Sequence, residues 1–477
     1  MNNPKQRPSL LEPESRGGDT AEGGFVFQDN MLISRIPKWL SQECFWEMIR
    51  EAMGDGEAKF FSPRVGETRE FVEFKNHQVT SSQFWSEVDR FWNLDKGAPG
   101  LYTRFVLVCR GVSAPVGRVL NALRRVRDAF PFYNKSGKKI QESSIQDLIS
   151  TVKKLGRSKE KAIFLFSKVW IESEAQDANE LGLEVFRTEL IKAFPECGNL
   201  AGNVLRCSYY SLKNLLKEKR NKPIARAELE NALWSDIPDD VRGDKTPVKT
   251  LITIKPTGYK INYEILFEWG EFFGEGRKFP PPDEWIRLLD ELRATRSWIE
   301  SVRRLNRIAL SGIYRISWGL GFGYVFSAVA GYNIDMEYKG QIWSTDAFGD
   351  TRYKWDEKIL GNSQSDEIAM SIGILRNIQE DVNDFLAKQG GSERIQLILN
   401  SKKPILSAAD AIIAAHEAKL ALIRILTITK AKVVHLFMAV PAHFALFFGH
   451  HLNATAIIQF YEWSFSGNYI PSIRFKT

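Results

Sequence analysis

The sequence has few of the residues on which several common protein chemistries depend. It holds four cysteines among 477 residues, and no two of them form a CxxC pair. This spacing disfavours a cysteine zinc cluster or a disulfide framework, and it fits a reducing cytoplasm. Six histidines are present, and His77 is the only one before residue 400. Histidine-metal nucleases and Ser-His-Asp hydrolases are therefore disfavoured in the first half of the chain.

Nucleotide-binding and membrane-spanning patterns are also missing. The P-loop pattern GxxxxGK[ST] does not occur, and "GLGFG" at 319–323 lacks the dinucleotide fingerprint, so an ATPase or a dehydrogenase has little support. The N-terminus has no basic-then-apolar signal. The two most apolar stretches are interrupted by Arg315 and by Pro441 with its flanking histidines. We expect no membrane span, because neither stretch keeps about 20 consecutive apolar residues.

The composition is that of a globular protein with large cores. Hydrophobic residues make up 44%, aromatic residues 12% and charged residues 26% of the chain. Its length predicts two or three domains. The net charge of +7 modestly favours polyanionic partners. Basic residues gather in 118–130, 135–140, 153–161 and 213–226, so a nucleic-acid surface, as against ordinary solvated helix faces, is expected in the first 230 residues.

The first half of the chain predicts an α/β domain. Residues 1–23 form an expected flexible tail, a domain with a helical extension occupies 24–235, and the loop at 234–247 marks a boundary. Thr80 and Gln83 have capping-box spacing and predict a helix start. The expected helices are 24–36, ending at Pro37, then 42–53, a helix after Thr80, 114–130 and 143–155, and the expected strands are 54–65, 68–77, 102–110 and 161–172.

The second half, 245–477, contains an internal sequence repeat. After two strands in 248–270 and a helix in 281–302, residues 308–343 and 432–463 each read strand, tight loop, helix, Asn-containing turn, strand and Trp. A repeat of this length predicts a duplicated β-α-β lobe with a pseudo-twofold axis, and hence a second α/β domain.

The segment "EFVEFKNHQVT" at 70–80 carries the candidate chemistry. Residues two apart on a strand share a face, so Glu73 and Lys75 project together. A hairpin would bring Asp55 beside Glu73, and the two carboxylates would offer oxygen ligands to Mg²⁺, with Lys75 positioning or deprotonating the attacking water. Glu57 shares the strand face with Asp55 and is the alternative ligand. Taken alone, an exposed Glu/Lys pair is more often only a solvated strand face.

These residues resemble two known families. Asp55, Glu73 and Lys75 have the spacing of the PD-(D/E)XK signature, and with "GGFVFQ" and "YTRFVLVC" the first half resembles restriction-endonuclease-like DNA endonuclease domains of bacterial antiphage effectors. The resemblance implies that Gln28 helps to hold the metal water. The second half, with "LSGIYRISWGLGFGYVFSAVAGYNI" and "HLFMAVPAHFALFFGHHLNATAIIQFYEW", is similar to SAVED domains, which are two fused CARF-like (Rossmann-like) lobes.

Together the two parts resemble the nuclease-SAVED effectors of CBASS defence. This resemblance implies a cytoplasmic bacterial enzyme that uses Mg²⁺, or Mn²⁺ in its place, and cleaves double-stranded DNA. A partner nucleotidyltransferase would make a cyclic oligonucleotide, expected to be a cyclic trinucleotide, whose binding drives homo-oligomer assembly. The alternatives are a non-catalytic sensor that grips DNA and, with less support, a second half that degrades its ligand.

The ligand-binding residues are predicted from the repeated lobes. In a doubly wound α/β lobe, ligands lie at the carboxyl ends of strands, where loops lead into helix N-termini and backbone N–H groups can meet phosphates. Tryptophans there can stack on bases, although those that end strands can equally be core residues. The candidates are Arg315, Ser317, Trp318, Gly319, Trp343, Val440, Pro441, His443 and Trp463.

Overall fold

The chain divides into two compact units, Met1–Thr246 and Pro247–Thr477, and each is described by itself. The computed structural model describes residues 13–50, 54–128, 137–173, 178–242, 250–255, 265–269, 281–312, 315–338, 340–349, 352–361, 365–453, 455–464 and 467–475.

The first unit is built on one six-stranded sheet. The strand order is β5-β4-β3-β2-β1-β6. The pairs formed by β3 with β4 and by β4 with β5 are parallel, while β2 pairs antiparallel with both β1 and β3. The strands are β1 (Phe45–Arg50), β2 (Gly56–Ser62), β3 (Gly66–Val79), β4 (Tyr102–Val112), β5 (Val169–Glu172) and β6 (Pro223–Ala225).

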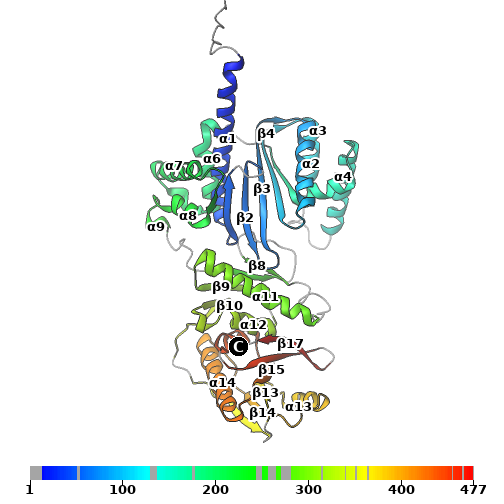
Figure 1. Ribbon diagram of the computed structural model, residues 1–477, viewed down its shortest axis with the longest axis vertical. Helices are drawn as coiled ribbons and strands as arrows, with labels where there is room; N and C mark the ends of the chain where they lie inside the picture. The colour runs from blue at the N-terminus through cyan, green and yellow to red at the C-terminus, as the bar shows by residue number, and fades with distance from the viewer. Residues whose placement is uncertain are drawn as a thin grey trace, which may run out of the picture. The chain divides into compact units, whose positions relative to one another are not determined.

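Helices cover both faces of this sheet because successive strand residues alternate between two cores. Val72 and Phe74 of β3 join the core on the side of α1, whereas Phe71 and Val79 join the core on the side of α2. Figure 1 shows α1, α6, α7 and α8 on one side of the sheet and α2, α3 and α4 on the other. The helices are α1 (Pro13–Leu40), α2 (Ser81–Gly97), α3 (Ala114–Asp128), α4 (Gly137–Lys154), α5 (Lys159–Lys168), α6 (Ala178–Ala193), the 3₁₀ turn Pro195–Asn199, α7 (Gly202–Glu218), α8 (Arg226–Trp234) and α9 (Asp239–Arg242).

Three local predictions for this unit are wrong. Residues 42–53 were expected to be helical, but β1 pairs there between β2 and β6, and the sheet ladder outweighs the weak helical pattern. The strand predicted at 161–172 is mostly α5, whose first turn is capped by the Ser158 hydroxyl accepting from the Lys161 amide. The helix predicted at 24–36 is longer at both ends: α1 begins at Pro13 and continues through Pro37 to Leu40, since a proline in the last turn removes only one helical hydrogen bond. Residues 1–12 of the predicted tail lie outside the described residues.

The second unit contains two sheets. One has the order β11-β10-β9-β7-β8 and the other β12-β14-β13-β15-β16-β17. No helix in the described part of the chain is long and apolar enough to cross a membrane. The strands are β7 (Thr250–Lys255), β8 (Ile265–Glu268), β9 (Arg307–Gly312), β10 (Asn333–Tyr338), β11 (Gln341–Ser344), β12 (Asp356–Leu360), β13 (Glu367–Ile374), β14 (Ile395–Ser401), β15 (Val433–Ala439), β16 (Ile457–Trp463) and β17 (Tyr469–Phe475). The helices are α11 (Pro282–Trp298), the π-helical turn Ile299–Arg303, α12 (Ile316–Val325), the 3₁₀ turn Ala328–Ala330, α13 (Gln379–Lys388), α14 (Ala408–Thr429) and α15 (Ala442–His451).

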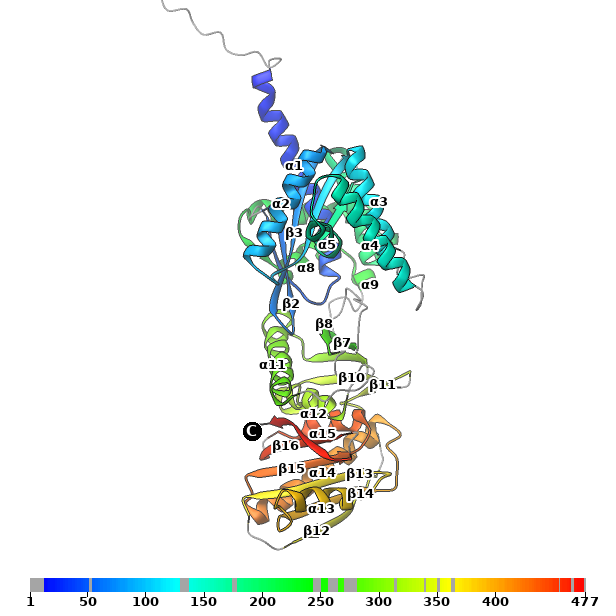
Figure 2. The same cartoon turned by 90° about the vertical axis from the view of Figure 1, so that its right-hand side faces the viewer.

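The predicted internal repeat is present in this unit. The segment β9-α12-β10 and the segment β15-α15-β16 each place a helix between two parallel strands. Helices α12 and α15 lie against each other between the two sheets (Figure 2). A Cβ atom added to Gly323 would lie 2.0 Å from the Leu446 carbonyl oxygen, and one added to Gly449 would lie 2.2 Å from the Leu320 carbonyl oxygen. This reciprocal contact is the one expected of two lobes related by a pseudo-twofold axis, and it requires glycine on both helices.

Candidate active site and ligand-binding residues

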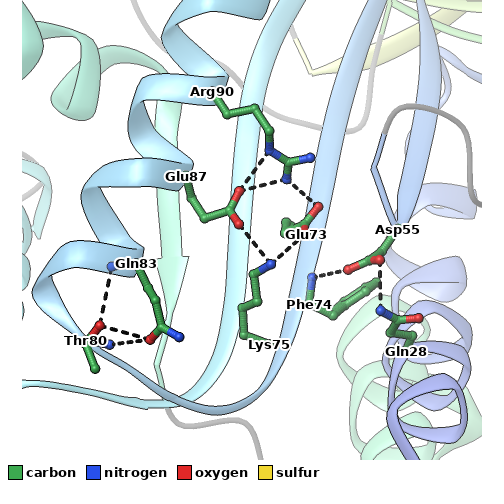
Figure 3. A network of polar contacts seen from close by, with 9 residues as sticks. All are labelled: Gln28, Asp55, Glu73, Phe74, Lys75, Thr80, Gln83, Glu87 and Arg90. Atoms are coloured by element: carbon green, nitrogen blue, oxygen red, sulfur yellow. Dashed lines mark hydrogen bonds and ion pairs between the residues drawn. The ribbon is translucent and has the colours of Figure 1, made fainter. Parts of the chain in front are cut away.

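The β2–β3 hairpin brings Asp55 to the side of β3. Gly56 pairs with Val72, so Asp55, one residue earlier, lies level with Glu73 and Phe74. The Phe74 amide donates to Asp55 Oδ2 at 2.7 Å, and Gln28 Nε2 on α1 donates to Asp55 Oδ1 at 2.9 Å (Figure 3). The structure therefore places Asp55 beside Glu73, as the spacing predicts, and brings Gln28, expected from the family resemblance, to Asp55.

Glu73 and Lys75 project together from the face of β3 that packs against α2. Lys75 Nζ lies 2.9 Å from Glu73 Oε1 and 2.8 Å from Glu87 Oε1 on α2. The guanidinium of Arg90, also on α2, lies 2.5 Å from Glu73 Oε2 and 2.8 Å from Glu87 Oε2. These four side chains form a closed ring of alternating charges, which we call the β3–α2 ring (Figure 3).

Glu87 and Arg90 were not singled out from the sequence. The available signal was helical spacing, since Glu87 lies three residues after Phe84 and four before Phe91, which are both buried. A carboxylate on the buried face of a helix requires a partner, and the facing strand supplies Lys75. The structure confirms the predicted helix α2 and its capping box, whereas the rotation that aims Glu87 and Arg90 at β3 was not predicted.

The pKa values at the site reflect burial and crowding of charge. The pKa of Asp55 is raised to about 6: burial is the largest cause, the negative charge of Glu73 adds to the shift, and the Phe74 amide and the charges of Lys75 and Arg90 oppose it. For Lys75, burial lowers the pKa, but hydrogen bonds to Glu87 and Glu73 more than offset this, so its pKa is raised. Lys75 is therefore an ammonium ion at neutral pH.

The alternative carboxylate, Glu57, has a different environment. Its side chain is buried and pairs with Arg69 at 3.1 Å between NH1 and Oε2. It lies opposite Phe71 in the β2–β3 ladder, two residues away from the position level with Glu73. The geometry therefore favours Asp55 over Glu57 as the partner of Glu73.

The strand β3 is irregular directly after the site. Lys75 pairs with Cys109 of β4, but the register shifts before Gln78 pairs with Gly111. Such bulges re-aim side chains and are frequent beside active sites. The exposed side chain of His77 lies in this shifted segment, and no role in the site follows from its position.

The predicted basic surface is partly visible in the first unit. On α3 the exposed residues include Arg118, Arg124 and Arg125. On the segment from α4 to α5, Lys153, Lys154 and Lys159 are exposed. Arg226, from the fourth basic segment, is instead buried, and its guanidinium donates to the carbonyl oxygens of Leu40, Gln42 and Phe45.

In the second unit, the N-terminus of α12 is occupied by a carboxylate. Ser317 Oγ donates to Glu462 Oε1 at 3.1 Å, and Arg315 NH1 lies 3.5 Å from Glu462 Oε2. Glu462, on β16, is 7% exposed, and burial raises its pKa while Arg315 and Ser317 oppose that shift. Arg315 and Ser317 were predicted to contact the ligand, but here they bind Glu462, at the place where a phosphate was expected.

Several other predicted ligand residues have core positions. Trp318 is 2% exposed and packs on Trp269 and Phe322, and Trp343 is 4% exposed. His443 is buried with its ring centroid 4.6 Å from that of Trp343. The predicted base-stacking role is therefore corrected for Trp318 and Trp343, because packing within the domain already covers their rings, and His443, predicted as a polar contact, is buried with them. Gly319 and Val440 are buried as well, and Pro441 is the N-cap residue of α15.

Trp463 has a more open environment than the other predicted tryptophans. It ends β16 and is 37% exposed, with the Arg376 guanidinium 5.7 Å from its ring centroid. Leu375, which follows β13, is 65% exposed and adopts a left-handed backbone with φ of 63°. Strained, exposed residues of this kind gather at binding sites. These residues lie where the parallel strands β13 and β16 end, which is the usual ligand edge of such a sheet.

Comparison with known protein families shows what the second unit resembles. Residues 291–475 match the model of the SAVED family, the SMODS-associated and fused to various effectors sensor domain. The second unit is thus similar to SAVED domains. The matched residues include both repeated lobes, since they extend from α11 to β17.

The likeness extends beyond the SAVED domain to nearly the whole chain. The chain is 27% identical over 469 residues to CD-NTase-associated protein 4 of Moraxella osloensis, covering 97% of this chain and 98% of that protein. Its relative of the same name from Acinetobacter sp. (strain ATCC 27244 / 9458) is 26% identical over 484 residues, again covering 97% of this chain and 98% of that protein.

Solved structures show the same relationship in three dimensions. The Acinetobacter baumannii Cap4 SAVED/CARF-domain containing receptor, in complex with the cyclic trinucleotide 2′3′3′-cAAA, matches with a TM-score of 0.81 and 23% identity, covering 95% of this chain and 99% of that one. The Moraxella osloensis Cap4 receptor matches with a TM-score of 0.76 and 25% identity, covering 94% of this chain and 99% of that one. The chain therefore has the fold of Cap4 receptors.

Proposed function

We propose that this protein is an effector of CBASS antiphage defence in which a cyclic oligonucleotide, bound by the SAVED domain, activates a divalent-metal-dependent nuclease that cleaves double-stranded DNA. The observation that supports catalysis is the convergence of Gln28, Asp55, Glu73 and Lys75 around one point of β3. The sensor part is supported by the SAVED match and by the cyclic trinucleotide bound to the similar Cap4 receptor.

The two carboxylates fit a hydrated magnesium ion. Among the side chains that the structure describes, no group of three or more His, Cys, Asp or Glu residues could hold a metal ion. Mg²⁺ commonly uses only one or two carboxylates and keeps several waters. The charge of Glu73 helps raise the pKa of Asp55 to about 6, so the pair carries a local repulsion that a divalent cation would relieve. Asp55 and Glu73 are thus the proposed ligands, with Mn²⁺ as a substitute.

The protein groups around this pair have distinct tasks. When bound, the metal would supply charge stabilisation to the scissile phosphate and acidify a water molecule. Gln28 and the Phe74 amide hold both oxygens of Asp55 and so fix the direction of the carboxylate. The raised pKa of Lys75 favours a positively charged side chain that orients the attacking water and stabilises negative charge on the phosphate, over one that removes the water's proton.

The SAVED domain would convert ligand binding into activation. We place the ligand, expected to be a cyclic trinucleotide made by a partner nucleotidyltransferase, at the carboxyl ends of β13, β15 and β16, where Trp463 is available for stacking. Binding can activate the enzyme only if the ligand favours the active assembly over the idle one. A ligand-induced homo-oligomer would meet this requirement.

A plasmid-cleavage experiment tests the proposal. The full chain is incubated with plasmid DNA, Mg²⁺ and a panel of cyclic di- and trinucleotides, and fragments are expected with the cognate ligand alone. Lys75→Ala is expected to remove cleavage while ligand affinity, measured by calorimetry, stays unchanged. Retained cleavage by Lys75→Ala would end the catalytic assignment.

A second candidate function, a non-catalytic sensor that binds DNA, is favoured by one observation. Both oxygens of Glu73 already contact cationic side chains, Lys75 and Arg90, as they would in a degenerate active site. The same experiment separates the two functions, because the scaffold predicts ligand-dependent DNA retention on a gel with no fragments under any metal.

A further inference from the structure

The β3–α2 ring places a guanidinium on the oxygen that a metal would need. Glu73 Oε1 contacts Lys75 at 2.9 Å and Glu73 Oε2 contacts Arg90 at 2.5 Å. A carboxylate oxygen held this closely by a guanidinium cannot also approach a dication without strong repulsion between the two positive groups. In the ring, the guanidinium of Arg90 therefore supplies the positive charge beside Glu73 that a bound metal ion would supply (Figure 3).

We propose that Arg90 is a built-in substitute for the divalent cation, which neutralises Glu73 in the metal-free protein and must leave it before the metal binds. This inference rests on the proposed metal-dependent nuclease and names a residue that controls loading of its site. Glu87 is the positioning residue that retains Arg90 after the exchange, because it already holds the same guanidinium at 2.8 Å.

The environment of Arg90 suits a side chain that moves. Its side chain is 37% exposed, compared with 10% for Glu73, 15% for Glu87 and 26% for Lys75. Its guanidinium also lies over two aromatic rings, 5.2 Å from the centroid of Phe71 and 5.7 Å from that of Phe91. Contacts with Glu87 and these rings can persist when the contact with Glu73 is broken, so the exchange does not expel the cation into an apolar core.

The exchange of Arg90 for the metal also leaves charges around the site that suit a bound dication and a phosphate. Before it, Lys75 and Arg90 balance Glu73 and Glu87, and Asp55 is the extra negative charge. After it, Asp55 and Glu73 face the dication, while Arg90 and Lys75 share Glu87. A guanidinium beside a loaded metal site is well suited to bind phosphate oxygens through paired hydrogen bonds.

The experiment measures Mn²⁺ binding to the full chain by calorimetry and by electron paramagnetic resonance, without DNA or nucleotide. Arg90→Met removes the competing charge at similar length, so we expect Mn²⁺ to bind roughly tenfold more tightly than to the unaltered protein. Arg90→Lys keeps the charge and is expected to bind within about twofold of the unaltered protein. Arg157→Met is the matched control. It removes an arginine paired with Asp89 of α2, the helix that carries Arg90, and no change in Mn²⁺ affinity is expected.

Thermal unfolding gives a second readout. Metal-free Arg90→Met is expected to unfold at a lower temperature, because Glu73 loses a neutralising partner, and saturating Mn²⁺ should raise its Tm more than that of the unaltered protein. Mn²⁺ affinity that is unchanged or weaker in Arg90→Met would overturn the inference. If Arg90→Met does not fold, Arg90→Gln carries the same expectations.

The experiment separates failure of this inference from failure of the proposed function. Glu73→Gln removes a proposed ligand and is expected to abolish Mn²⁺ binding. If it does so while Arg90→Met binds Mn²⁺ no more tightly, the metal site stands and the role of Arg90 is wrong. If neither the unaltered protein nor any variant binds Mn²⁺, both proposals fall together.

Discussion

Two carboxylates with raised pKa values, Asp55 in the first unit and Glu462 in the second, have opposite surroundings. Burial is the largest cause of the shift for both. For Asp55 the next cause is the negative charge of Glu73, which raises the pKa further. For Glu462 the next causes are Arg315 and Ser317, which oppose the shift.

This difference separates a candidate functional carboxylate, Asp55, from a structural one, Glu462. Two carboxylates held together repel each other, and Lys75 and Arg90 oppose only part of the resulting shift in the pKa of Asp55. Such arrangements gather at functional sites. A single buried carboxylate that binds an arginine and a hydroxyl is complete within the fold. Asp55 and Glu73 therefore remain the candidates for chemistry, while Glu462 explains how the start of α12 is held against β16.

The largest expected effect comes from replacing Asp55, the proposed metal-binding carboxylate of the first unit. Asp55→Asn keeps the size of the side chain but removes the charge that would hold the metal, so we expect ligand-activated DNA cleavage to fall by roughly a hundredfold or more. Glu57→Gln is the matched comparison, because its carboxylate pairs with Arg69 and does not face Glu73. Initial rates of plasmid cleavage decide between them. The assignment of Asp55 is wrong if Glu57→Gln is the variant that loses cleavage.

The candidate catalytic site could be predicted because strand geometry is nearly rigid. A residue separation of two fixes Glu73 and Lys75 on one face of β3, and a hairpin fixes the level of Asp55 to within about one residue. The ring partners on α2 could not be predicted in the same way, because the sequence does not give the rotation of a packed helix about its axis. Glu87 and Arg90 thus emerged only with the tertiary structure.

The candidate ligand-binding residues were harder to predict because tryptophan is common both in cores and on binding surfaces. The sequence repeat aligns Trp343 with Trp463, but Trp343 lies on β11 and is 4% exposed, whereas Trp463 ends β16 and is 37% exposed. The difference arises from neighbours distant in sequence. His443 and Tyr338 cover Trp343, whereas Trp463 contacts Tyr469 and lies below Arg376. No local pattern in the sequence carries that information.

The fold errors have a related cause. Residues 45–50 carry a pattern that suits a helix or a strand, and pairing with β2 and β6 decides for the strand. In 161–172 the apolar run predicts a strand, but only Val169–Glu172 joins the sheet. The duplicated lobes of the second unit were predictable because the repeat supplied two independent copies of one pattern.

An intermediate effect, on stability alone, is expected in the second unit. Glu462→Ala removes the partner of the poorly exposed Arg315 and the acceptor of Ser317, which should cost roughly 3 kcal/mol of unfolding free energy. Thermal unfolding should show a Tm for this unit lower by roughly 6 to 12 °C. Mn²⁺ binding in the first unit should not change.

Glu357→Ala is the control for that variant. It also breaks a Glu–Arg pair in the same sheet, with Arg424 at 2.7 Å, but Arg424 is 56% exposed, so the expected loss is below about 1 kcal/mol. Equal losses in the two variants would show that the Glu462 group is no more than a surface pair, and the contrast with Asp55 would lose its basis.

The smallest expected effect is a pH dependence of Mn²⁺ binding, which we expect from Asp55 and not from Glu462. Because the pKa of Asp55 is raised from 3.8 to about 6, its protonated form favours the folded metal-free state below about pH 4, and this contribution is lost as pH rises through about 6. Protons and Mn²⁺ then compete for the same oxygens. Mn²⁺ affinity should be constant above about pH 6 and should fall roughly tenfold for each pH unit below it, which corresponds to about 1.4 kcal/mol per unit.

Calorimetric titrations of Mn²⁺ between pH 5 and 8 measure this dependence, and thermal unfolding with and without Mn²⁺ compares the two units. The Tm of the first unit should rise with Mn²⁺ above about pH 6 and respond less below it, whereas the Tm of the second unit should be insensitive to Mn²⁺ at every pH. The reason is that Glu462 is buried and already binds Arg315 and Ser317. A pH-independent affinity for Mn²⁺ would mean that Asp55 is not a ligand, and a response of the second unit would mean that Glu462 shares the chemistry of the first.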